Sequence, residues 1–300
     1  MKYWLRCAYL CAICLANSCF GQDTNSGNNP KPAFGLRSYA DSLFAVGKYY
    51  ESTIAYDKAA FFCEIPNEKA GLLLKESYAL KQLFDYQSAE RVLSRLNIFT
   101  LNDSLKYAVC YEASFCAYLA GNFSVAKQHL ENLSALNNPV FVQDASLLHA
   151  FILNEETKWS EAKKYLEQFV NSRTELNDSS KNRLQKEINV LYAEVNIPQL
   201  KSVRKAAILS KLLPGMGQLY AGYFWEGAGS FLFNVGVVGL TAVGIYNHYY
   251  ITSILFGGSM IRRFYEGNIA RAEFLTRKAN YRQSKSYNEK LKNRFQAYLK

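Results

Sequence analysis

Residues 121–133 read GNFSVAKQHLENL, and the spacing within this stretch decides the fold that we expect. Gly121 is followed by an aromatic residue at Phe123 and a small residue at Ala126, and apolar residues come four and seven positions later, at Leu130 and Leu133. In an α-helix these positions share one face. The stretch therefore predicts a helix that starts just after a tight turn and packs on the helix before it.

The same pattern occurs four times in the chain. Its aromatic position is occupied by Tyr49, Tyr86, Phe123 and Trp159, at intervals of 37, 37 and 36 residues. The other residues of this repeat signature are Gly47, Tyr56, Ala59, Ala89, Gly121, Ala126 and Ala162. Ser52 stands where the other copies have alanine, and the fourth copy lacks the turn glycine. The regular interval predicts antiparallel helix pairs over residues 35–196, with a last helix that starts near Ser179–Ser180, runs through 182–196 and caps the array.

The array resembles the tetratricopeptide repeat, with units slightly longer than the usual length of about 34 residues. The resemblance covers residues 35–172. It implies an all-α fold with a tetratricopeptide-like α-solenoid, whose concave face binds an extended peptide or a helix of a partner protein. The alternative is a rigid spacer. In both cases we expect the four aromatic residues to be core residues.

The first 21 residues have the features of a secretory signal peptide. Two basic residues precede an apolar run from residue 7 to 16, which is too short for a membrane span. We expect cleavage after Gly21, and the alternative is a lipoprotein acylated at Cys19. The polar residues 22–34 are predicted to be a flexible linker.

The remaining cysteines are Cys63, Cys110 and Cys116. Three cysteines without a CxxC pattern or metal-binding partners do not make a disulfide framework. We expect small buried residues at helix contacts, and the alternative is a single disulfide between two of them.

The positive charge is concentrated in the last third of the chain. The whole chain has a net charge of +10, whereas residues 201–300 have 15 Lys/Arg and 4 Asp/Glu, a net charge of +11. This asymmetry indicates a contact with a membrane surface or a polyanion in that region. It argues against a protein that binds nucleic acid as a whole.

Residues 201–265 are predicted to form a membrane domain. The basic amphipathic stretch 201–213 suits a helix at the membrane interface. The apolar stretches 227–246 and 249–263 then predict a transmembrane helical hairpin, in which arginine and aromatic residues lengthen the second stretch. The alternative is a buried hairpin of a soluble domain.

Small and polar residues inside these stretches suggest how the hairpin packs. Asn234 is a polar residue within the first stretch, and we expect its side chain to hold the two helices together. Gly236, Gly239, Gly257 and Gly258 are expected to let the helices approach closely.

The segment PGMGQLYAG at 214–222 joins the interfacial helix to the hairpin. It resembles the P-G-x-G-Q-x-Y-x-G motif of a family of small bacterial two-helix membrane domains, and the resemblance covers residues 206–271. The matching residues are Pro214, Gly215, Gly217, Gln218, Tyr220 and Gly222. We expect a membrane-entry turn in which Gln218 satisfies freed backbone groups and Tyr220 lies at headgroup level, the alternative being a ligand site.

Residues 266–300 are predicted to form a basic, aromatic helical tail. Such a helix suits anionic lipid headgroups. The alternatives are a solvated coiled-coil arm and a contact with the protein's own repeats.

No catalytic or metal-binding pattern occurs in the sequence. The three histidines, His129, His149 and His248, have no carboxylate or cysteine at metal-ligand spacing. We therefore predict a non-enzymatic protein without cofactor or metal, an interaction scaffold of the bacterial cell envelope whose repeats bind a partner protein. The alternative is an accessory subunit of a membrane transport or secretion complex, with the hairpin as the site of homo-oligomerisation.

Two signals conflict over the side of the membrane. The signal peptide predicts that the repeats are exported to the periplasmic side. Both flanks of the hairpin are basic and its loop has no Lys or Arg, so the positive-inside rule favours the cytoplasmic face of the inner membrane. We follow the signal peptide because export is decided as the N-terminus emerges.

Overall fold

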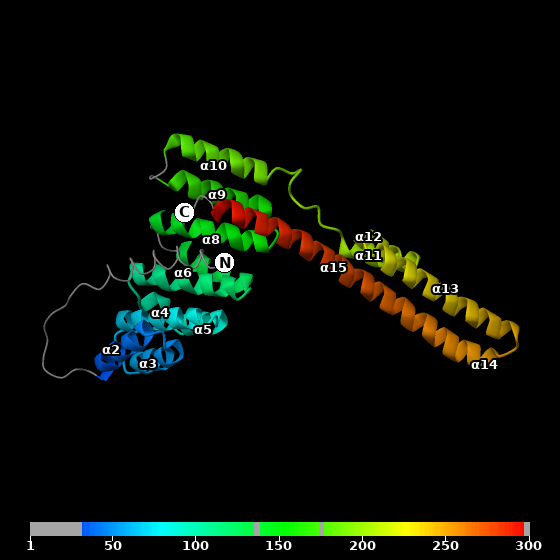
Figure 1. Ribbon diagram of the computed structural model, residues 1–300, viewed down its shortest axis with the longest axis horizontal. Helices are drawn as coiled ribbons and strands as arrows, with labels where there is room; N and C mark the ends of the chain where they lie inside the picture. Colours follow the sequence, from blue (N-terminus) through cyan, green and yellow to red (C-terminus); the bar gives the residue numbers. More distant parts are fainter. Residues whose placement is uncertain (1–31, 135–138, 174–176, 297–300) are drawn as a thin grey trace. The chain divides into compact units, whose positions relative to one another are not determined.

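The computed structural model describes residues 32–134, 139–173 and 177–296. Over these residues the chain is helical and contains no strand, which confirms the all-α class (Figure 1). It divides into two compact units, Met1–Val195 with Lys292–Lys300, and Asn196–Leu291. The predicted signal peptide and most of the predicted linker lie outside the described residues. The linker prediction was wrong at its end, because helix α2 begins at Pro32, where proline is tolerated in the first turn.

The first unit consists of helices that pack as successive pairs. They are α2 (Pro32–Ala45), α3 (Tyr49–Phe61), α4 (Pro66–Gln82), α5 (Tyr86–Ser94), α6 (Asp103–Leu119), α7 (Phe123–Ser134), α8 (Pro139–Glu155), α9 (Trp159–Ser172) and α10 (Asp178–Leu191), with a short 3-10 helix, η1 (Ile98–Thr100), before α6. Each even-numbered helix from α2 to α8 packs on the next helix, and α4 contacts α6 as α6 contacts α8. The second helix of every pair starts at the aromatic residue of the repeat signature.

The four turns inside these pairs share one backbone geometry. The residue two positions before each aromatic is left-handed, with φ of 79° at Gly47, 61° at Phe84, 80° at Gly121 and 62° at Thr157. In each turn, two backbone amides donate hydrogen bonds to carbonyls of the preceding helix; the amide of Gly121, for example, donates to the carbonyl of Tyr118 at 3.1 Å. This is the Schellman arrangement, which satisfies the last carbonyls of a helix. The second and fourth turns therefore form without glycine.

The small residues of the signature occupy the tightest positions of the core. Ala59, Ala89, Ala126 and Ala162 are all fully buried. Ser52 is fully buried too, because its hydroxyl donates to the carbonyl of Tyr49 at 2.8 Å and so brings no unpaired polar group into the core.

The signature aromatics are less buried than predicted. Trp159 is buried, but Tyr49, Tyr86 and Phe123 are only half-buried. Each of these three rings packs against an aromatic residue in or just before the turn, as Tyr49 does against Phe44 with ring centroids 5.3 Å apart. They lie at the start of the second helix of each pair, next to the turn, where they are partly exposed to solvent.

The cysteines of the first unit agree with their prediction. Cys63, Cys110 and Cys116 are free and buried. Burial raises the pKa of the Cys110 thiol to about 11 and that of Cys116 well above its usual value. The thiolate is the reactive form, so these cysteines are packing residues in the folded unit.

The second unit begins with α11 (Val203–Leu212), α12 (Met216–Ala221) and α13 (Phe224–Tyr246). The chain then reverses at His248, which is left-handed with φ of 66°. It continues through α14 (Tyr250–Thr252), the π-helical turn η2 (Ser253–Gly257) and α15 (Gly258–Gln296), whose residues from Lys292 belong to the first unit. α13 contacts both α14 and η2.

One helix in the described part of the chain, α13, is long and apolar enough to cross a membrane, and only 6% of its most apolar stretch is buried. The second predicted span, 249–263, is not a separate helix, because α15 runs without a break past residue 265 into the basic tail.

Candidate functional site

The glycines of the PGMGQLYAG segment are required by the backbone conformation or by the packing of the second unit. Gly215 and Gly222 are left-handed, with φ of 95° and 96°. A Cβ at Gly217 would collide with the carbonyl of Ala206 and lie 2.7 Å from the Cβ of Ala272. Since real Cβ atoms do not come so close, only glycine lets α12 lie against both α11 and α15. Within the motif, residues 216–221 form helix α12, and the left-handed residues Gly215 and Gly222 lie at its two ends.

Gln218 is the centre of a buried polar network between these helices. Its side chain is fully buried, as is that of Ser210. Its carbonyl oxygen accepts from the Ser210 hydroxyl at 3.2 Å, and its amide donates to the backbone carbonyl of Asn268 at 3.3 Å and to the Asn268 side chain. Ser210, not Gln218, satisfies the amide freed at the turn, since its hydroxyl accepts from Gly217 N at 3.1 Å.

The other fixed positions of the segment also make internal contacts. The Tyr220 hydroxyl accepts from the amide of Ser202 at 3.1 Å, and Asn280 on α15 bonds both backbone groups of Lys201 at 2.8 Å. Pro214 is half-buried at the end of α11. These contacts make the motif a structural clamp between α11, α12 and α15. Ser210, Asn268 and Asn280 were missed from the sequence because no local pattern links them to the motif.

The surface of α13 is apolar, exposed and hollowed on one side. A groove of about 820 Å³ is lined by Gly229, Leu232, Phe233, Gly236, Val237, Leu240, Thr241, Thr252, Ser253, Phe256, Gly257 and Met260. Gly257 packs against Thr241, as predicted for a close helix contact, but nothing lies within 4 Å of a Cβ built at Gly236, Gly239 or Gly258. Asn234 donates to the carbonyl of Ser230 in its own helix at 2.7 Å, so the expected bond across the hairpin is not made.

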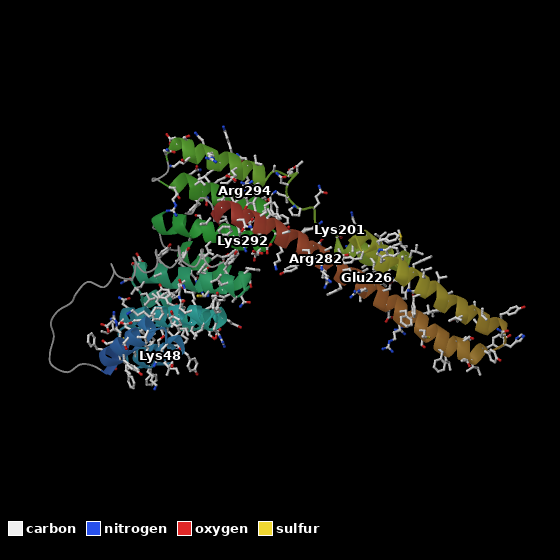
Figure 2. The ribbon with its side chains drawn as sticks, viewed as in Figure 1. Lys48, Lys201, Glu226, Arg282, Lys292 and Arg294 are labelled. Carbon is white, nitrogen blue, oxygen red and sulfur yellow. The ribbon has the colours of Figure 1, made fainter. Side chains whose placement is uncertain are left out.

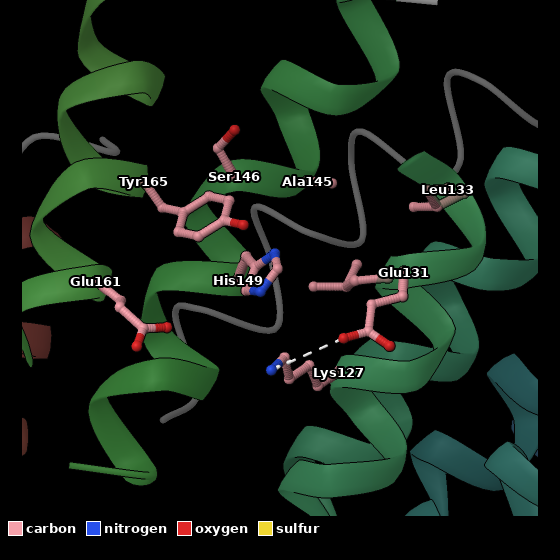
Figure 3. Close-up of a pocket in the computed structure, with 9 residues that line it drawn as sticks. Lys127, Glu131, Leu133, Ala145, Ser146, His149, Glu161 and Tyr165 are labelled. Atoms are coloured by element: carbon pink, nitrogen blue, oxygen red, sulfur yellow. Dashed lines mark ion pairs between the residues drawn. The ribbon is translucent and has the colours of Figure 1, made fainter. Parts of the chain in front are cut away.

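A second, smaller cavity of about 290 Å³ lies in the first unit between α7, α8 and α9 (Figure 3). The ring of His149 stacks on Tyr165 with centroids 4.0 Å apart, and burial together with nearby Lys127 lowers the pKa of this histidine. Lys127 is 3.7 Å from Glu131. The cavity thus places charged side chains of both signs around the His149 ring.

The other two histidines make local contacts. His129 lies 2.9 Å from Glu90 and links α7 to α5, and His248 lies 2.7 Å from the Tyr250 hydroxyl in the chain reversal. Among the residues that the structure describes, no group of three or more His, Cys, Asp or Glu side chains gathers as a metal site would require.

A third site is formed where the end of α15 meets helices of the first unit. Lys292 donates to Glu155 on α8 at 2.5 Å, and its ammonium lies 5.2 Å from the ring centre of Tyr118 on α6. Arg294 lies 3.9 Å from Glu187 on α10, and Phe295 is only 5% exposed. Burial acts to lower the pKa of Lys292, but Tyr118 and Glu155 outweigh it and the pKa is raised. Figure 2 labels both basic residues.

This third site joins a basic helix end to an acidic face made by α6, α8 and α10. Of the three alternatives for the tail, the contacts of Lys292 and Arg294 match the one with the protein's own repeats. Searches of family models, curated proteins and solved structures find no match to this chain. Its function is therefore inferred from these residues and their geometry.

Proposed function

We propose that this protein is a non-enzymatic, membrane-anchored interaction scaffold of the bacterial cell envelope. In this proposal residues 35–196 form a tetratricopeptide-like α-solenoid that binds a partner protein, and the second unit holds it at a membrane. The observation that carries the proposal is the surface of α13, where Leu232 and Leu240 are 68% and 76% exposed. Such a large apolar surface is unfavourable in water and needs a lipid or protein cover.

The length and ends of α13 support a membrane span. Its 23 residues are about 35 Å long at the rise of an α-helix, enough for the hydrocarbon core of a bilayer. Trp225 and Tyr246, at opposite ends of the helix, are 84% and 83% exposed. Aromatic residues at both ends are typical of the two headgroup regions. The stretch after the reversal at His248 lies beside α13 and completes the proposed hairpin.

The helix α11 supports the same placement. Ala206, Ala207 and Ser210 face the interior of the second unit, whereas Arg204 and Lys211 are exposed. Exposed basic residues next to an apolar span are attracted to anionic headgroups.

The helix pairs support a binding role for the first unit. Their first helices contact one another in order from α4 to α8, which is the arrangement that makes one continuous face in a solenoid. Such faces bind extended peptides or helices through side chains contributed by several repeats. We place this face on the periplasmic side, with the cytoplasmic face of the inner membrane as the alternative.

The anchor is tested by alkaline extraction of membranes from cells that express the full chain. The wild-type protein should stay in the membrane pellet, and Leu232→Arg with Leu240→Arg should move it into the supernatant. Val190→Arg is the matched control, since Val190 is 63% exposed on α10 in the first unit. Release of the wild-type protein would refute the anchor.

The location and the partner need two further measurements. Tags after Asn28 and after Lys300 are tested with protease in spheroplasts. Digestion of both tags only after the outer barrier is opened supports export, and protection of both supports the cytoplasmic alternative. In-cell cross-linking of the full chain should recover the same partner protein in repeated experiments, and consistent recovery of none would refute the scaffold.

A further inference from the structure

We propose that the face formed by Tyr118, Glu155 and Glu187 is a binding site for a helix end that presents a Lys-x-Arg-Phe pattern. The segment Lys292–Phe295 is its resident intramolecular ligand. This inference rests on the proposed scaffold role and deepens it, because it names the chemistry of the partner and the contact that the partner must displace.

The first support is the register of the segment. Lys292 and Phe295 are three residues apart in α15, so they share one face of the helix, and Phe295 is 5% exposed. Arg294 projects to the side, is 65% exposed and reaches Glu187 from the edge of the site. Protein interfaces commonly have a buried anchor side chain surrounded by a polar rim. In this segment Phe295 has the burial of an anchor, and Lys292 and Arg294 are the charged residues beside it.

The second support is the acidity of the receiving face. The Glu155 and Glu187 side chains are only 19% and 18% exposed, and they come from two different helices of the array. The Tyr118 ring, on a third helix, is 8% exposed and lies under the Lys292 ammonium. A carboxylate and a ring that meet one ammonium select a cation strongly, since both interactions strengthen when water is excluded.

The third support is the consequence of the covalent link. A ligand that is part of the same chain as its site has a raised effective concentration, so a partner must compete with it. The apparent affinity for the partner is then the intrinsic affinity multiplied by the fraction of molecules in which the tail has left the site. The site therefore selects a partner helix with lysine at i, arginine at i+2 and an aromatic residue at i+3. The bound tail prevents this partner from binding until the tail leaves the site.

The test uses the full chain in detergent micelles and a fluorescent peptide of residues 284–300, SKSYNEKLKNRFQAYLK. Binding is measured by fluorescence anisotropy. Lys292→Glu in the full chain weakens the resident ligand, so the wild-type peptide should bind at least about tenfold more tightly than to the wild-type protein. Lys290→Glu, an equal charge change at an exposed position of the same helix, should leave binding unchanged.

A charge swap separates a specific pair from loss of folding. Glu155→Lys in the full chain should abolish binding of the wild-type peptide, and a peptide carrying Lys292→Glu should restore it. Equal binding by wild-type and Lys292→Glu protein would overturn the proposal, as would the same gain from Lys290→Glu. A dimer in light scattering that is lost in either Lys292→Glu or Glu155→Lys would also overturn it, because the ligand would then come from a second copy. Neither readout depends on the membrane anchor or on the recovery of a partner by cross-linking, so failure here is distinct from failure of the scaffold.

Discussion

The left-handed turn residues of the first unit allow a sharp test of how the repeat is built. Gly121 has φ of 80°, and a Cβ built on it has no atom within 4 Å. Gly121→Ala therefore adds a methyl group to open space and changes only the conformational energy of the turn. We expect this substitution to destabilise the first unit.

The size of the effect follows from the backbone alone. An L-residue held in the left-handed region costs about 1–2 kcal/mol relative to glycine. No steric clash adds to this cost, because the site is open. Gly35, in α2, also has no neighbour within 4 Å of a built Cβ but has no positive φ. Gly35→Ala should instead stabilise by about 0.5–1 kcal/mol, because alanine is the better helix former.

Both variants are measured on the full chain in detergent by urea-dependent labelling of thiols. Cys63, Cys110 and Cys116 are buried in the first unit, so mass spectrometry of their peptides reports its opening without a signal from the second unit. The two variants carry the same chemical change, and the expected shifts of the urea midpoint are opposite in sign. Equal shifts, or a Gly121→Ala midpoint at the wild-type value, would refute the turn argument.

Three further predictions concern strain, charge and close packing. Thr157→Gly removes a β-branched residue from the left-handed turn before α9 and should stabilise the unit by about 1 kcal/mol in the same assay. Burial, with Asp57 adding to it and Arg95 opposing it, raises the pKa of Glu76 to about 7. The folded state then holds this proton more tightly than the unfolded state, so the contribution of Glu76 to stability is fully present below its unfolded-state pKa of 4.5. About 3 kcal/mol of this contribution is lost as pH rises through 7, a loss that Glu76→Gln should remove. Gly217→Ala should force α12 away from α11 and α15 and speed tryptic cleavage after Lys211 about tenfold, for a packing cost of about 1–3 kcal/mol.

Matched controls keep these three expectations testable. Glu51→Gln, at an exposed position of α3, should leave the pH dependence unchanged, and a flat stability profile of the wild-type protein from pH 5 to 8 would contradict the account of Glu76. Gly229→Ala, where a built Cβ meets nothing within 4 Å, should not change the cleavage rate after Lys211. A loss of stability in Thr157→Gly would mean that the threonine side chain contributes more than its backbone strain costs.

The helix pairs were predictable because the information is local. The aromatic, small and apolar positions of each repeat lie within about three turns of one helix, where spacing alone determines the shared face. Every second helix accordingly starts at its predicted aromatic residue. The capping helix starts close to its predicted position, at Asp178 behind an Asn177 cap, but it ends at Leu191 and not at residue 196. Helix ends depend on individual cap bonds that periodicity does not contain.

The turns without glycine show where local rules stop. Phe84 and Thr157 adopt the left-handed conformation that Gly47 and Gly121 adopt, although their residue types disfavour it. The packing of both flanking helices holds the backbone there, and this stabilisation exceeds the strain of about 1–2 kcal/mol.

The amino-acid sequence by itself determined the all-α class, the repeat interval, the apolar stretch at α13 and the glycine-rich segment between α11 and α13. Only the tertiary structure decided what these residues touch. The partners of Gln218 lie 8 residues before it at Ser210 and 50 residues after it at Asn268, and Lys292 meets Glu155 across 137 residues of chain. Contacts at such separations depend on how whole helices pack, and helix packing is set by the summed shape of many side chains and not by any short pattern.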